Sequence, residues 1–80
     1  KRIRGILAGM EGEKAAVRVQ AAAGRTVSNL TIPPEVSLVA VQRNDQILGL
    51  DKDIILKEDD IIYLSGTSDS VRFVTRMLEG

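Results

Sequence analysis

Carboxylates form the densest group of chemically capable side chains in this 80-residue chain, which contains neither His nor Cys. The group comprises Asp51, Asp53, Asp59 and Asp60. Oxygen ligands of this kind suit hard cations such as calcium, but the spacing and terminal Glu of an EF-hand are missing. We therefore interpret the four as solvated turn residues. Without imidazole or thiolate, the commonest general base, zinc ligands and nucleophile pairs are also missing, and we expect no enzymatic activity.

Two arginines are the best candidates for binding an anionic ligand. Arg43 ends an apolar segment beside Asn44, where its guanidinium could bind an anion or pair with a carboxylate. An ion pair, within the chain or across a dimer, is the favoured interpretation. Arg18 could supply polar contacts at a subunit junction or simply face solvent. With Ser37, which opens the apolar segment, the predicted ligand-binding residues are Arg18, Ser37, Arg43 and Asn44.

The length and charge of the chain limit the functions that it can have. A single domain of this size has a marginal core, so a partner chain is plausible. Eleven basic and eleven acidic residues cancel, which argues against binding of nucleic acid by overall charge. Apolar runs fall far short of the roughly 20 residues that span a bilayer, and the lack of Cys fits the cytoplasm. Because the first residue is Lys, we expect a piece of a longer protein.

Alternating and continuous apolar segments predict a small sheet. Residues 1–12 are predicted to form a linker or a short helix, and residues 13–80 the folded domain. The strands are expected over 14–22, with Val17, Val19 and Ala21 inward, and over 36–43, 46–48 and 60–65. Asn44-Asp45 favours a two-residue hairpin, and a helical turn is expected over 26–30.

The C-terminal segment has the pattern of an amphipathic helix. Thr67 or Ser68 can cap it, Asp69 suits its first turn and Arg76 its last. Its core stripe is predicted to comprise Val71, Val74 and Leu78, flanked by Phe73 and Met77. Both aromatic residues of the chain, Tyr63 and Phe73, are expected in the core. The predicted fold class is therefore α+β, a small and mostly antiparallel sheet with short helices packed on it.

Three motifs in order carry a family resemblance that covers about 13–78. They are Gly24 to Leu30 with Pro33, the strand Val39–Arg43, and Leu56 with Asp60–Gly66. On these the chain resembles the RCK C-terminal domain, also called TrkA-C. Asp59 occupies a position where this family often has Gly.

The resemblance implies a function in cation transport. Family members pair as dimers, usually follow an NAD-binding Rossmann half in potassium channels and transporters, and bind ligands at the dimer junction. The resemblance therefore implies a cytoplasmic homodimer that senses a small, nucleotide-like ligand. Its partner would be a membrane channel, a transporter subunit or a fused transmembrane domain, at the inner face of the cell membrane. The residues identify no cofactor.

Some members bind cyclic di-AMP through a D-x-R motif and an Asn that opens the main strand. The matching segment here reads Leu30-Thr31-Ile32-Pro33, and the strand opens at Ser37, so that motif is absent.

Two other functions are open from the sequence. The first is the ligand-sensing or dimerisation domain of a transcriptional regulator or of a carrier for another solute, and a transcriptional regulator would have a helix-turn-helix upstream of Lys1. The second is a dimerisation module without a ligand, in which a charge at Val39 would abolish pairing.

Overall fold

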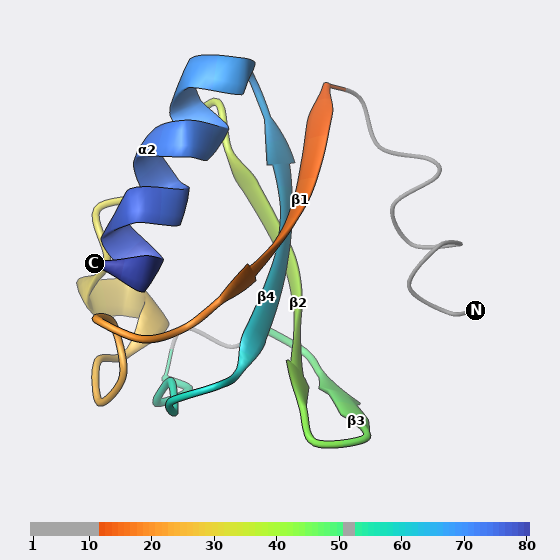
Figure 1. Ribbon diagram of the computed structural model, residues 1–80, viewed down its shortest axis with the longest axis vertical. Coiled ribbons are helices and arrows are strands. Elements are labelled where there is room, and N and C mark those ends of the chain that lie inside the picture. The colour runs from red at the N-terminus through yellow and green to blue at the C-terminus, as the bar shows by residue number, and fades with distance from the viewer. Residues whose placement is uncertain (1–11, 51–52) are drawn as a thin grey trace.

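Among the residues that the structure describes, one antiparallel sheet of four strands organises the fold (Figure 1). The coordinates are a computed structural model that describes residues 12–50 and 53–80. The strands are β1 (Glu13–Arg18), β2 (Ser37–Arg43), β3 (Gln46–Leu48) and β4 (Ile61–Gly66), and their order across the sheet is β1-β4-β2-β3. A 3-10 helix η1 (Val27–Asn29) lies between β1 and β2, and helix α2 (Ser68–Glu79) ends the chain. The α+β prediction is confirmed; most of the predicted N-terminal segment lies outside the described residues.

Strand β4 lies in the interior of the sheet, between β1 and β2. Its successive side chains point alternately to the two faces of the sheet. Val17, Ile62 and Val41 lie in one row across β1, β4 and β2. All three are buried in the main cluster. The adjacent row of Arg18, Ile61 and Gln42 belongs to the opposite face, because neighbouring residues of a strand point to opposite sides.

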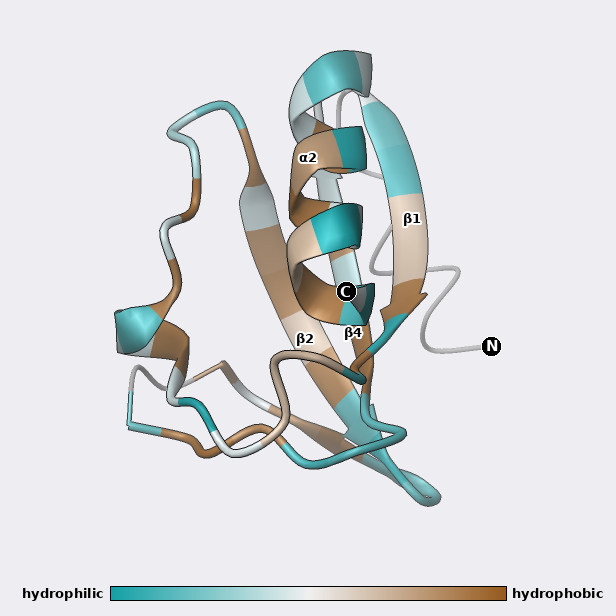
Figure 2. Ribbon diagram, turned by 60° about the vertical axis from the view of Figure 1, so that its left-hand side comes forward, coloured by the Kyte–Doolittle hydropathy of each residue, from teal (hydrophilic) through white to brown (hydrophobic). Residues whose placement is uncertain are grey.

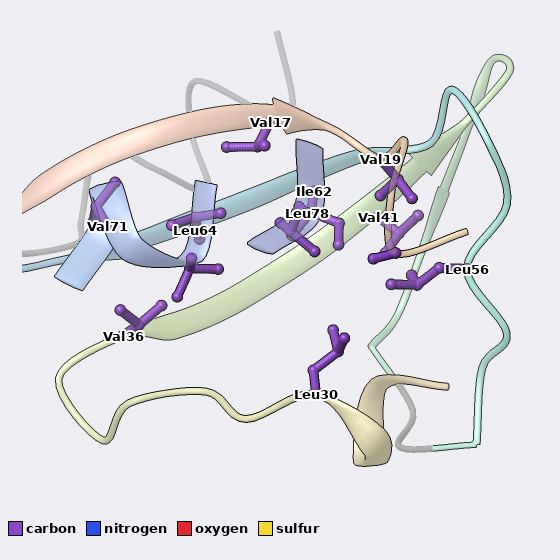
Figure 3. Packing of buried hydrophobic residues seen from close by; sticks show 12 residues of the cluster. Val17, Val19, Leu30, Val36, Val41, Leu56, Ile62, Leu64, Val71 and Leu78 are labelled. Atoms are coloured by element: carbon purple, nitrogen blue, oxygen red, sulfur yellow. The ribbon is translucent and has the colours of Figure 1, made fainter. Parts of the chain in front are cut away.

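Helix α2 covers one face of the sheet, over β1 and β4. It buries Val71, Val74 and Leu78 at helical spacing, as predicted. Residues from the loops complete this core, namely Val19, Ala22, Leu30, Val36 and Leu56. Figure 3 shows Leu30 and Leu56 approaching the cluster from segments outside the sheet. Among the described helices, none is long and apolar enough to cross a membrane.

Strand β1 is shorter than predicted, because the residues that follow β1 form backbone hydrogen bonds with the end of α2. Strand β1 ends at Arg18, and the backbone N–H groups of Gln20 and Ala22 donate to the carbonyl of Leu78, at 2.9 and 3.3 Å. The last carbonyls of a helix have no partner inside the helix, so these bonds satisfy one of them. The period of two is lost there, and Ala22 is buried while Ala21 is exposed.

Two turns use left-handed backbone at residues other than glycine. Asn44 has φ of 56° in the hairpin between β2 and β3, which confirms the predicted two-residue turn. Asp59 has φ of 73° just before β4. Glycine adopts that conformation most easily, so Asp59 preserves the shape of a turn where glycine would be expected.

The prediction that Phe73 belongs to the core is wrong. Its side chain is 55% exposed, whereas Tyr63 is buried as predicted. At about 100° per residue, Phe73 lies roughly 200° around the helix from Val71, on the far side from the sheet.

We predict that Gly66→Ala destabilises the fold. A Cβ at this position would lie 2.6 Å from the carbonyl oxygen of Glu35 and 3.1 Å from Cα of Val36, and both are backbone atoms that cannot move aside cheaply. Overpacking of this kind costs about 1–3 kcal/mol, and each kcal/mol lowers the Tm by about 4–8 °C in a domain of this size. Gly49→Ala is the control, because nothing lies within 4 Å of its Cβ position. Equal Tm values for the two variants, measured by circular dichroism, would contradict the prediction.

Candidate functional site

Arg43 and Asp60 form an ion pair at the end of β2, as the favoured interpretation of Arg43 required. Arg43 Nε donates to Asp60 Oδ1 at 3.0 Å, and Nη2 donates to Oδ2 at 2.7 Å. The Asp60 side chain is 2% exposed and that of Arg43 is 24% exposed. This two-point geometry fixes the guanidinium plane and shields the pair from water.

The same pair holds the loop that leads into β4. Arg43 Nη2 also donates to the carbonyl of Ile55 at 3.0 Å, and the N–H of Lys57 donates to Asp60 Oδ2 at 2.9 Å. On its other side the loop pairs with residues before η1, where the N–H of Leu56 donates to the carbonyl of Arg25 at 2.9 Å. The ion pair therefore joins the end of β2 to the loop before β4, and the backbone bonds of Leu56 join that loop to the segment before η1.

The environment of Asp60 favours its charged form. Burial by itself raises the pKa of the carboxyl, but hydrogen bonds from Arg43 and the Lys57 N–H, together with the positive charges of both residues, lower it below its ordinary value. The hydrogen bond and the charge of Asp60 in turn outweigh burial and raise the pKa of Arg43. Both groups are charged at neutral pH.

The four aspartates that are clustered in the sequence do not share one environment in the structure. Asp60 is buried and paired, so its interpretation as a solvated turn residue is wrong. Asp53 and Asp59 are exposed as expected, and Asp51 lies outside the described residues. No cluster of three potential metal-binding side chains occurs within residues 12–50 and 53–80.

Arg18 presents a different environment from Arg43. Its side chain is 62% exposed and lies 3.8 Å from Asp59 Oδ1, whose side chain is 69% exposed. Exposed pairs at this distance contribute little to stability, so the guanidinium is available for other contacts. Arg18 belongs to the sheet face opposite α2.

The four predicted ligand-binding residues do not converge on one point within a single chain. Ser37 begins β2 and pairs with Ser65, whereas Arg43 and Asn44 stand at the other end of the strand. Ser37 and Arg43 are six residue steps apart along the strand, a separation of about 20 Å. Arg43 approaches Asp60 on the side of the core, and Arg18 lies on the opposite face.

Sequence reasoning missed a polar contact on the face that carries Arg18. The Tyr63 hydroxyl donates to Gln42 Oε1 at 2.6 Å. Gln42 is in the same cross-strand row as Arg18, with Ile61 between them. The period-two pattern of β2 could have identified Gln42, because it places residues 42 and 43 on opposite faces.

We predict that Asp60→Asn lowers the free energy of unfolding by about 2–3 kcal/mol at pH 7, because it leaves the half-buried Arg43 charge without its carboxylate. The folded-state pKa of Asp60 lies below the unfolded value, so its stabilisation is present above about pH 4 and is lost as the pH falls through the folded pKa. Chemical denaturation at pH 7 and below pH 4 measures this contribution.

Asp59→Asn provides the matched control, because that carboxylate is exposed and only weakly paired. It should leave stability at pH 7 nearly unchanged. A gap between wild type and Asp60→Asn that stays constant down to strongly acidic pH would contradict the assigned origin.

Comparisons with known proteins agree with this architecture. A solved structure described as "Structure of RCK domain with cda" matches with a TM-score of 0.72 and 16% sequence identity, covering 82% of this chain and 97% of that chain. A search of curated proteins gave no match. The family model of the TrkA-C domain matches residues 15–79. Because this match spans nearly the whole folded region, the chain belongs to the TrkA-C domain family, the regulatory domains of ion transport systems.

Proposed function

We propose that this chain is the cytoplasmic sensor of a potassium or other cation channel or transporter, and that it acts as a homodimer. Membership of the TrkA-C family over residues 15–79 is the observation that carries the proposal. The ligand is a small, nucleotide-like anion, and its binding changes the geometry between two copies. That change biases a gate in a membrane subunit or in a fused transmembrane domain, which places the sensor at the inner face of the cell membrane.

The distribution of candidate residues supports a ligand site shared between copies. Ser37 and Arg43 stand about 20 Å apart on β2, too far for one small ligand to contact both in a single chain. We therefore propose that a second copy brings together residues that are separate in one chain: Ser37 at one end of β2, Arg43 and Asn44 at its other end, and Arg18 on the opposite face of the sheet. A ligand that prefers one dimer geometry by a few kcal/mol is sufficient to shift the equilibrium between them.

The arginines have separate roles in this proposal. Arg18 supplies the attraction for the ligand, since its exposed guanidinium has only a weak partner in Asp59. Arg43 is held by Asp60 and keeps the Ile55 segment in place. A ligand that contacts Arg43 would therefore act directly on the loop that precedes β4.

We expect a nucleotide ligand to raise the Tm of the chain. Circular dichroism suits the measurement because the sequence has no Trp. Cyclic di-AMP, ATP, ADP and NAD are the probes, and calcium serves as a separate test of the carboxylates. At about 100 times its dissociation constant, a ligand stabilises the native state by roughly 2.7 kcal/mol, which is a shift of several degrees here.

Arg18→Ala should remove this shift without unfolding the protein, whereas Arg25→Ala should retain it. Arg25 is a suitable control because it is also exposed and its side chain bonds only within its own turn, to the carbonyl of Asn29. The absence of a shift with every nucleotide, or an equal shift in the Arg18 variant, would count against the proposed site.

A further inference from the structure

Asp59 lies next to the arginine that we assign to the ligand. Its Oδ1 is 3.8 Å from Arg18 Nη1 and accepts a hydrogen bond from Gln20 Nε2 at 3.3 Å. The side chains of Arg18 and Asp59 are 62% and 69% exposed, so both are open to the solvent from which a ligand arrives. One cation and one anion therefore lie together at the place where an anionic ligand is expected.

Backbone hydrogen bonds keep this carboxylate beside Arg18. The Asp59 N–H donates to the carbonyl of Val19 at 2.9 Å, and the Val19 N–H donates to the carbonyl of Asp60 at 2.7 Å. Asp60 itself is held by Arg43. The Asp59 side chain can rotate, but its backbone stays paired with the residue that follows Arg18. A ligand that displaces the carboxylate from the guanidinium therefore leaves the negative charge nearby.

The backbone at this position does not require an aspartate. Asp59 has φ of 73°, in the left-handed region that glycine adopts most easily and that asparagine also tolerates. The exposed pair with Arg18 adds little to stability. Neither the conformation of the turn nor the stability of the fold accounts for the carboxylate, so we look for its role in its effect on Arg18.

We propose that Asp59 is a specificity-determining residue of the Arg18 part of the ligand site, and that its carboxylate selects against highly charged anions. This inference deepens the proposed function and rests on it. Phosphate oxygens that pair with Arg18 also approach Asp59, and the repulsion between them grows in proportion to the charge of the ligand. The polyphosphate chain of ATP carries more charge than the phosphodiesters of cyclic di-AMP, so Asp59 disfavours ATP more strongly. Selectivity then comes from a repulsive element built into the site.

Removal of the carboxylate from the 80-residue chain tests this role. Asp59→Asn and Asp59→Gly both suit the left-handed backbone, so both variants should remain folded. Dissociation constants for ATP, ADP and cyclic di-AMP are measured by nuclear magnetic resonance titration that follows the backbone amide of Arg18. Both variants should bind ATP at least about tenfold more tightly than wild type, with a smaller gain for ADP and the smallest for cyclic di-AMP. Added salt should reduce the gain.

Asp69→Asn is the matched control, because it removes the same charge from a distant place. Asp69 belongs to α2, which Figure 2 shows on one side of β1 and β4, whereas Arg18 belongs to the opposite face of the sheet. The Asp69 side chain is 97% exposed, so this variant isolates the effect of net charge. It should bind every nucleotide as wild type does. Inorganic tripolyphosphate, a polyanion without a base, should show the same gain as ATP in the two Asp59 variants.

Three results would overturn the role of Asp59: equal gains for all three nucleotides, an equal gain in Asp69→Asn, or tighter binding of ATP by wild type than by the Asp59 variants. If no nucleotide binds but the gain for tripolyphosphate remains, nucleotide sensing is rejected and the effect of Asp59 on Arg18 is retained. If neither nucleotides nor tripolyphosphate bind to wild type or to either Asp59 variant, both the sensor and the selector are rejected.

Discussion

The ion pair between Arg43 and Asp60 is the constraint on which the arrangement of the strands depends. It joins the last residue of β2 to the residue before β4, and through Ile55 and Lys57 it fixes the loop between them. Strand β1 enters the same region, because the N–H of Val19 donates to the carbonyl of Asp60 at 2.7 Å. Asp60 therefore links β2 and the loop before β4 through its carboxylate, and the chain after β1 through its backbone carbonyl. Burial of a charge is unfavourable unless hydrogen bonds compensate for it, and Asp60 receives them from three N–H groups.

A second set of contacts ties the helix to the sheet without any signal in the local sequence. The segment after β1 leaves the strand pairing so that Gln20 and Ala22 can donate to the carbonyl of Leu78. The alternation of Val17 and Val19 correctly predicted the inward side of this strand. It could not predict that the end of a helix some sixty residues later competes for the same backbone. Strand boundaries of this kind are set by tertiary hydrogen bonds, whereas the hairpin at Asn44 follows from local backbone preferences and was predicted correctly.

The chemical types of the candidate residues could be predicted better than their positions relative to one another. An ion pair at Arg43 was the favoured interpretation, but its partner was assigned to a solvated turn, since nothing in four clustered aspartates distinguishes the buried one. The side of the sheet on which each strand residue lies was easier to predict from the sequence. Adjacent strand residues point to opposite sides, so Gln42 and Arg43 cannot serve the same surface of one chain. Ser37 is separated from Arg43 by the length of the strand. The shared site that we propose between two copies would let such residues act together.

Helix α2 has two distinct sides, one packed on the sheet and one exposed. Val71, Val74 and Leu78 form the stripe toward the sheet, and residues 69, 72, 73 and 76 are centred on the opposite side of the helix. Phe73 was predicted in the core because it is apolar and close in sequence to that stripe, although its angle around the helix places it outside. A domain of this size buries only about 60% of the surface of its unfolded chain, so the homodimer that we propose would add burial that the single core does not supply.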